Sequence, residues 1–406
     1  MLAYLEAENA YTDALTRTQA GLRDALFKEF KARIQETDET PPVWWLGHWY
    51  STRTVEGLEY EIHRRRTGSL EATEDVLLDE NELAAGKEFF ELRAFAVSPS
   101  HTLVAYGVNY DGTDFCDLHF RDLVRRRDLD DVITNMAGDV EWANDDRTLF
   151  YVEVDPALRP HQLWRYQLGE PGSQTLVFEE PDERFRVRIE KTKDDRWLVL
   201  SCVSTTTSEA RVLDASEPDG EFRLMEARRD GVRYFVEHHP DRGFLVMTNA
   251  DGAVNYKLCV APPDDPSASK WTDVVAHRED VRLTGVEPMR DHLVLAERAD
   301  AVRRLRVMAA SAATDVDAIV IEQPEAVSVA VLVLRLVARL PGPARLAPHS
   351  ARRKHRVPML SRARKASAAA RDVLARFSIG TRCFRRVERV SRRGRARRST
   401  GRAGRP

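Results

Sequence analysis

The feature that most constrains the fold is a β-hairpin pattern repeated about every 48 residues. Its clearest copy is 140–154, VEWANDDRTLFYVEV, in which an apolar run, a polar Asn-Asp-Asp turn and a second, β-branched and aromatic run follow one another, as in a β-hairpin. Similar patterns occupy 95–108, 187–203, 234–248 and, more weakly, 286–296. A fixed period of this length in an all-β pattern predicts the blades of a propeller. The turn markers Ser98, Asn144, Asp194, Asp241 and Arg290 are separated by 46, 50, 47 and 49 residues.

Each repeat also carries a second, more polar pair of strands, as in 117–123 (DLHFRDL) and 162–168 (QLWRYQL). A blade is hydrophobic on both faces and cannot bury either face alone, so blades stack around a common axis. The polar strands are then expected at the outer edges. Six blades are predicted, at 43–78, 92–125, 138–180, 185–228, 232–275 and 281–322. In the first blade, strands are predicted at 43–53, 58–64 and 74–78, with a hairpin turn at Glu56-Gly57.

The first 36 residues have apolar side chains at helical spacing, with charged residues between them. This pattern predicts two amphipathic helices, broken near Thr18 to Gly21. Thr40-Pro41-Pro42 ends the helical part, because proline lacks an amide proton and favours an extended residue before it. The apolar face of these helices packs either on the propeller itself or on another domain, and the sequence leaves both arrangements open.

Two groups of residues invite a functional interpretation. The aromatic cluster Trp44, Trp45, Trp49 and Tyr50 could stack on a ligand, but blade cores are rich in aromatic residues, so core packing is favoured. The pair His238-His239 near Asp241 could bind a metal or act as a base. It lies at the turn position of its repeat without a third ligand nearby in sequence, which favours a plain turn.

The net charge of −3 conceals two different compositions. From Val331 to Pro406 there are 23 Lys and Arg against two acidic residues, a net of +21, so the other 330 residues carry −24. The last stretch consists almost entirely of residues with GC-rich codons, which predicts a frameshifted and disordered tail. The alternative is a basic arm that neutralises nucleic-acid phosphates, although aromatic residues are nearly absent from it. Residues 327–340 are too short, and too charged, to span a membrane.

Motifs that carry chemistry are missing from the sequence. It contains no G-x-S-x-G, G-x-x-x-x-G-K-[ST], H-E-x-x-H or G-x-G-x-x-G segment, and so predicts a scaffold without a complete active site. The acidic start MLAYLEAENAY is unlike a secretory signal. No two cysteines form a C-x-x-C pair, and a reduced, cytoplasmic compartment is expected. The four cysteines are Cys116, Cys202, Cys259 and Cys383.

Seven segments within residues 1–328 carry a family resemblance: YLEAENAYTDALT, GLRDALFKEFKARIQETDETPPV, EDVLLDENELA, WANDDRTLFYVEVD, EEPDERFRV, TTTSEARVLDA and ERADAVRRLRVM. They resemble the prolyl oligopeptidase family of serine peptidases, of the oligopeptidase B (protease II) type. The resemblance implies a seven-bladed propeller over an α/β-hydrolase domain with a Ser-Asp-His triad. Members of this type cleave short peptides after Arg or Lys, with the propeller limiting substrate size and the N-terminal helices wrapping onto the hydrolase domain.

The likeness stops before any hydrolase domain begins. No catalytic, cofactor-binding or metal-ligating residue is therefore assigned, and the chain alone is expected to be inactive, with the hydrolase domain as its missing intramolecular partner. The predicted fold is an all-β propeller of the seven-bladed type with about six blades present. Its parts are helices at 1–40, a propeller at 43–328 and the tail at 329–406. Two alternatives remain: a propeller that binds peptides or proteins by itself, and a basic-tailed nucleic-acid-binding protein.

Overall fold

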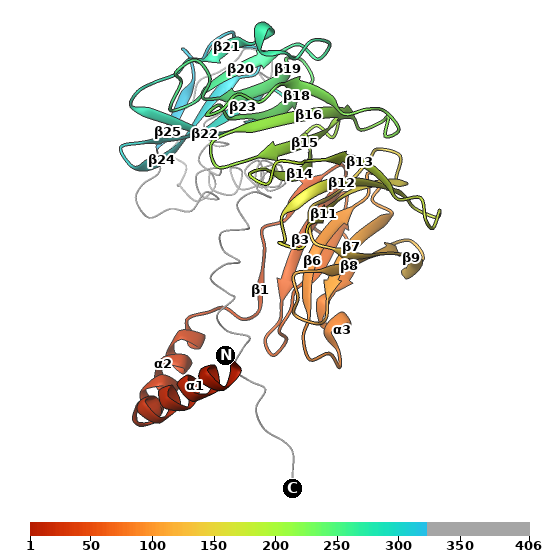
Figure 1. Cartoon of the computed structure of the whole chain (residues 1–406), viewed down its shortest axis with the longest axis vertical. Coiled ribbons are helices and arrows are strands. Elements are labelled where there is room, and N and C mark those ends of the chain that lie inside the picture. The colour runs from red at the N-terminus through yellow and green to blue at the C-terminus, as the bar shows by residue number, and fades with distance from the viewer. Residues whose placement is uncertain (323–406) are drawn as a thin grey trace, which may run out of the picture.

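The computed structural model describes residues 1–322, which form an N-terminal helical segment and six antiparallel β-sheets (Figure 1). The helices are α1 (Leu2–Thr16) and α2 (Ala20–Ala32), separated by the 3-10 turn η1 (Arg17–Gln19). This confirms the predicted pair of helices and the break between them. Figure 1 shows α1 and α2 set apart from the blades, and none of their residues is buried.

Blades one to three follow the helices in chain order. In blade one, β3 pairs with β1, β2 and β4. Its strands are β1 (Asp38–Glu39), β2 (Val43–Trp45), β3 (His48–Thr54), β4 (Ile62–Thr67) and β5 (Glu74–Asp79), followed by α3 (Glu80–Ala84). Blade two has β6 (Glu91–Val97), β7 (Leu103–Asn109), β8 (Cys116–Asp122) and β9 (Arg127–Met136), and blade three has β10 (Val140–Trp142), β11 (Thr148–Val154), β12 (Pro160–Gln167) and β13 (Thr175–Glu179).

Blades four to six are four-stranded meanders in which each strand pairs with the next. Blade four has β14 (Arg186–Lys191), β15 (Trp197–Val203), β16 (Ser208–Asp214) and β17 (Arg223–Glu226). Blade five has β18 (Tyr234–His239), β19 (Gly243–Thr248), β20 (Lys257–Ala261), the 3-10 turn η2 (Ala268–Lys270) and β21 (Thr272–Val275). Blade six has β22 (Val281–Pro288), β23 (His292–Ala299), β24 (Val302–Ala309) and β25 (Ile319–Glu322).

The structure corrects the predicted strands in blades one and two. The stretch 43–53 is two strands, because Leu46 and Gly47 adopt φ values of +43° and +94° and form a turn, and a glycine readily takes such a conformation. Strand β4 begins at Ile62, four residues later than predicted. Blade two extends to Met136, because β9 forms its fourth strand. Most residues of β9 are exposed, so its sequence shows little apolar alternation. Helix α3 was also missed, although Asp79 and Glu82 have the spacing of a capping box.

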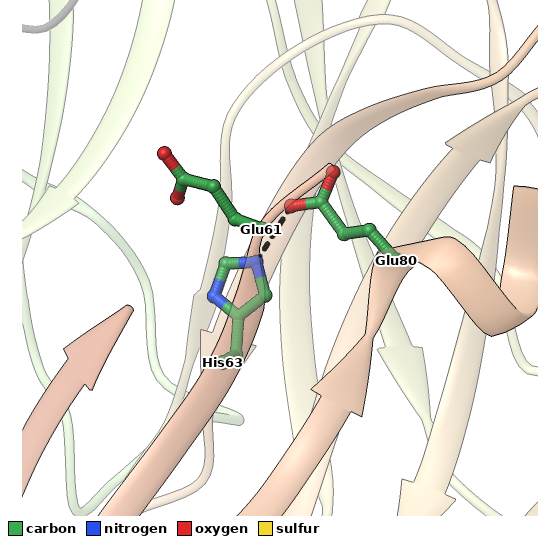
Figure 2. Close-up of side chains that lie close together, drawn as sticks. All are labelled: Glu61, His63 and Glu80. Atoms are coloured by element: carbon green, nitrogen blue, oxygen red, sulfur yellow. Dashed lines mark hydrogen bonds and ion pairs between the residues drawn. The ribbon is translucent and has the colours of Figure 1, made fainter. Parts of the chain in front are cut away.

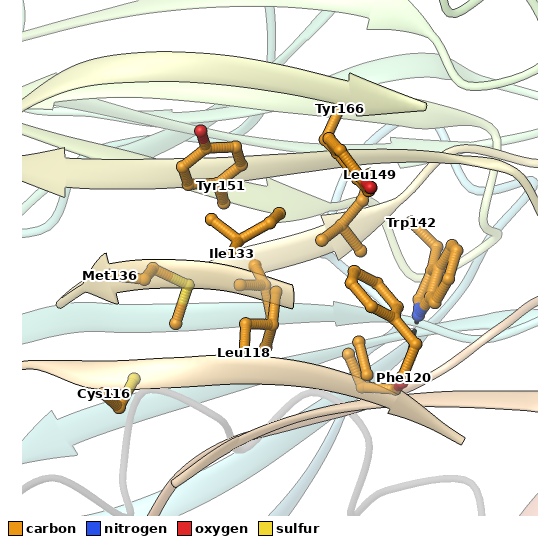
Figure 3. Packing of buried hydrophobic residues seen from close by; sticks show 12 residues of the cluster. Cys116, Leu118, Phe120, Ile133, Met136, Trp142, Leu149, Tyr151 and Tyr166 are labelled. Carbon is orange, nitrogen blue, oxygen red and sulfur yellow. Dashed lines mark hydrogen bonds between the residues drawn. The ribbon is translucent and has the colours of Figure 1, made fainter. Parts of the chain in front are cut away.

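The core lies between neighbouring blades, as the two-sided burial of each blade requires. In Figure 3, apolar side chains from blades two and three face each other. Trp142 is 1% exposed, and its indole Nε1–H donates to the Ala96 carbonyl at 3.0 Å, which joins the two inner strands β10 and β6. The cluster includes Cys116, Leu118, Phe120, Ile133, Met136, Leu149, Tyr151 and Tyr166.

Some predictions concern residues outside 1–322. The tail at 329–406, its frameshifted and disordered character and a seventh blade beyond Glu322 all lie there. Among the helices of residues 1–322, none combines the length and apolar character needed to cross a bilayer.

Candidate functional site

The turns between the two innermost strands of the blades gather at one end of the propeller. They lie at 46–47, 98–102, 143–147, 192–196, 240–242 and 289–291, and together they are called the turn ring below. Neighbouring turns are hydrogen-bonded. The Ser100 N–H donates to Asp146 Oδ1 at 2.7 Å, and Asn144 Nδ2 donates to the Asp195 carbonyl at 2.8 Å. The polar turn residues that marked the repeat therefore also hold the blades in their order.

A pocket of about 340 Å³ opens within the turn ring. Across it, Trp45 Nε1–H donates to Asp195 Oδ2 at 3.1 Å, so that the turn of blade one contacts the turn of blade four. The prediction that the aromatic cluster is core holds for Trp49, which is 9% exposed, but Trp45 lines this pocket. The lining consists of Trp45, Leu46, Pro99, Asn144, Asp194, Asp195, Arg196 and Ser216.

Two carboxyl groups beside the pocket have pKa values shifted in opposite directions. Burial opposes ionisation of Asp194, but hydrogen bonds from His238, at 2.6 Å, and from Thr192 outweigh it and lower the pKa of this carboxyl. Burial raises the pKa of Glu237 to about 7, although the backbone N–H groups of Lys193 and His238 donate to it.

The turn predicted at His238-His239 lies one residue later, because both histidines are the last residues of β18, directly before the turn at 240–242. The ring of His239 bonds through Nε2 to the carbonyls of Met289 and Arg290 at 3.1 and 3.2 Å, so Nε2 carries the proton, and Nδ1 accepts from the Asp241 N–H. Both imidazoles are buried and link blade five to its neighbours.

One group of three potential metal ligands occurs within residues 1–322, and it lies elsewhere, in blade one. It comprises Glu61, His63 and Glu80, whose ligand atoms all lie within 4.8 Å of one another (Figure 2). The sequence pattern did not indicate this group. The alternation Glu-x-His at the start of a strand was its only local signal, and Glu80 follows 17 residues after His63.

The helical segment joins the propeller at the end opposite the turn ring. Asp38 of β1 pairs with Thr54, at the far end of β3 from the turn at 46–47. Large apolar side chains on and next to α1 and α2 are exposed to solvent, and we call them the helix apolar surface. They are Leu2, Tyr4, Leu5, Tyr11, Leu15, Leu22, Leu26, Phe27, Phe30 and Ile34.

Comparisons with known proteins give a consistent result. The family model described as "Prolyl oligopeptidase, N-terminal beta-propeller domain" matches residues 1–334. Dipeptidyl aminopeptidase BI of Pseudoxanthomonas mexicana is 39% identical over 332 residues, or 78% of this chain and 46% of the relative. Protease 2 of Moraxella lacunata is 32% identical over 316 residues, or 76% of this chain and 45% of the relative. The chain thus spans less than half the length of these relatives.

Solved structures agree. Oligopeptidase B from Leishmania major matches with a TM-score of 0.75 and 29% identity, over 80% of this chain and 47% of that one. Oligopeptidase B from Trypanosoma brucei, in a closed form with covalently bound antipain, matches with a TM-score of 0.73 and 28% identity, over 80% of this chain and 46% of that one.

Proposed function

This chain belongs to the prolyl oligopeptidase family through its N-terminal β-propeller domain, and on that premise we propose that it is the propeller part of an oligopeptidase B-like serine peptidase. The whole enzyme would hydrolyse short peptides after Arg or Lys, and the propeller would limit the size of the substrates that reach the catalytic serine. The chain alone would be inactive. It would work in the cytoplasm, in keeping with the three free, buried cysteines of the described residues.

The observation that carries this proposal is the helix apolar surface. Its side chains find no cover on the propeller, because none of the residues of α1 or α2 is buried. Each large apolar side chain that becomes buried contributes about 1.5–3 kcal/mol, so a docked hydrolase domain would gain substantially from covering several of them. Exposed apolar patches of this kind commonly mark an interaction surface.

A chimera tests the gating function. We would join residues 1–334 of this chain to the part of Protease 2 from Moraxella lacunata that the match leaves uncovered. The chimera should cleave a short fluorogenic peptide ending in Arg but leave unfolded casein intact, while the 406-residue chain alone should cleave neither. Equal cleavage of casein and of the short peptide by the chimera would show that the propeller is not a size filter.

Binding by the propeller alone is the second candidate, and the pocket in the turn ring favours it. Titration of the full chain with an Arg-containing peptide, followed through tryptophan fluorescence, separates the two functions. Saturable binding that is lost on Trp45→Ala would support a binding module. Association with DNA that falls steeply with added salt would support the nucleic-acid alternative instead.

The exposed helix apolar surface should make the isolated chain self-associate, and polar substitutions in α2 should reduce this association without destabilising the fold. Phe27 and Phe30 are exposed, and substitutions at exposed sites usually change stability by less than about 0.5 kcal/mol. The double variant Phe27→Ser, Phe30→Ser should therefore stay monomeric at higher concentrations in light scattering, with an unchanged Tm. Lys28→Ser, on the same helix, is the matched control. A lowered Tm in the double variant would mean that α2 packs on the propeller after all.

A further inference from the structure

We propose that Glu61, His63 and Glu80 form a Zn²⁺ site at the rim of blade one. His63 Nε2 lies 2.7 Å from Glu80 Oε1, and the ligand atoms of all three residues lie within 4.8 Å of one another. Figure 2 shows the imidazole and the Glu80 carboxylate directed at each other, with the Glu61 carboxylate nearby. The proposal does not depend on the peptidase function.

The backbone fixes the three residues at one corner of the blade. Glu61 and His63 are two residues apart at the start of β4, so their side chains leave the strand on the same side. Glu80 opens α3, and its backbone N–H donates to the Glu61 carbonyl at 3.2 Å. The His63 ring stacks on Phe95, with ring centroids 4.4 Å apart and planes 21° apart. The donor atoms are thus presented by packed, hydrogen-bonded elements.

The charge of this group is uncompensated, in contrast to other carboxylates in the protein. Glu74 is paired with Arg53, Arg64 and Arg66. Within residues 1–322, neither Glu61 nor Glu80 forms an ion pair with an arginine or a lysine, and the partner of Glu80 is the His63 imidazole. The His63 and Glu80 side chains are only 13% and 12% exposed. The Glu61 carboxylate next to the His63–Glu80 pair adds negative charge that a cation would neutralise.

The donor set selects zinc among common divalent ions. Zinc accepts imidazole nitrogen at about 2.0–2.1 Å and carboxylate oxygen at about 2.0–2.2 Å. Calcium and magnesium prefer oxygen donors alone. Side-chain rotations at Glu61 and Glu80 would bring the atoms to these distances, with the metal replacing the hydrogen bond between His63 and Glu80. Three protein ligands leave the fourth tetrahedral position to water.

Calorimetric titration of the chelator-treated, 406-residue chain with ZnCl₂ tests the site. One Zn²⁺ should bind per chain, and both Glu61→Gln and His63→Gln should weaken binding by more than about tenfold, since even residues outside the ligand set affect affinity by about 10–100-fold. Cobalt substitution should give visible absorption bands that both variants lose. His119→Gln is the matched control, because this histidine stacks on Tyr106 outside the group and should bind zinc as the parent chain does.

Two results of the titration would contradict the zinc site. Absence of stoichiometric binding, or equal affinity in the parent chain and in Glu61→Gln, would overturn the proposal and leave His63 and Glu80 as an ordinary ion pair. Glu61→Gln preserves side-chain volume and removes only charge. If circular dichroism shows that His63→Gln is unfolded, Glu61→Gln therefore decides the result alone.

Discussion

Replacement of Arg228 by methionine should lower the free energy of unfolding at pH 7 by about 3–5 kcal/mol, because it leaves the buried Glu180 carboxylate without its counter-ion and Glu209 with Arg211 alone. Arg228 Nη2 donates to Glu180 Oε2 at 2.6 Å, and its Nε donates to Glu209 Oε2 at 3.3 Å. The side chains of Glu180 and Glu209 are 1% and 9% exposed. Urea unfolding followed by circular dichroism measures the loss.

The pH dependence of stability gives a second measure of the same cluster. Burial opposes ionisation of Glu180, but hydrogen bonds from Arg228 and from the Asp182 N–H outweigh it and lower the pKa of this carboxyl below the ordinary 4.5. A carboxyl whose pKa is lower in the folded state stabilises the protein above its unfolded pKa, and this contribution disappears as pH falls through the folded pKa. In Arg228→Met the unpaired Glu180 carboxylate should instead take up a proton readily. The difference between variant and parent should therefore shrink below about pH 4.5.

Arg147→Met is the control for the charge change itself. Arg147 and Glu170 form an ion pair on the surface, with both side chains about half exposed. Exposed pairs contribute about 0–1 kcal/mol. If Arg228→Met cost no more than Arg147→Met, the cluster around Glu180 would not be an important part of the fold.

The period of the hairpin turns predicted the blades because each turn is stabilised by hydrogen bonds between residues close together in sequence. The Asp145 carboxylate, for example, accepts the N–H groups of Arg147 and Thr148 and closes the turn between β10 and β11. Such short-range chemistry can be read from a dozen residues. Strand β9 escaped notice because it lies at the outer edge of its blade and buries few side chains, which leaves little alternation to detect.

The candidate sites could not be predicted in this way. The indole of Trp45 meets Asp195, 150 residues later, only because blades one and four face each other across the turn ring. Arg228 meets Glu180 across 48 residues and a blade boundary. Such contacts follow from how the blades stack, whereas strand periodicity reports only which side chains of one strand are buried. The proposed zinc ligands share this property, since Glu80 belongs to a short helix that periodicity does not reveal.

Substitution of Gly243 by alanine should be as damaging as the loss of Arg228, for a purely steric reason. Gly243 begins β19, directly after a turn of the ring, with φ at +81°. A Cβ at this position would lie 2.5 Å from the Ala261 carbonyl oxygen and 3.0 Å from Pro263 Cδ. The carbonyl belongs to the neighbouring strand β20, whose Ala261 pairs with Phe244. The clash therefore falls on backbone that cannot move without opening the sheet of blade five.

The expected loss for Gly243→Ala is about 3–5 kcal/mol, from backbone strain of about 1–3 kcal/mol together with an overpacking cost of similar size. Gly252→Ala measures the backbone strain without the overpacking cost. Gly252 has nearly the same φ, +79°, but a Cβ there meets nothing within 4 Å, so that variant should lose only about 1–2 kcal/mol. Thermal unfolding of both variants, compared with the parent chain, measures the difference. Equal losses would mean that β19 and β20 lie further apart than their pairing shows. A larger loss at Gly243 would show that the close approach of β19 and β20, next to the turn at 240–242, allows no side chain at this position.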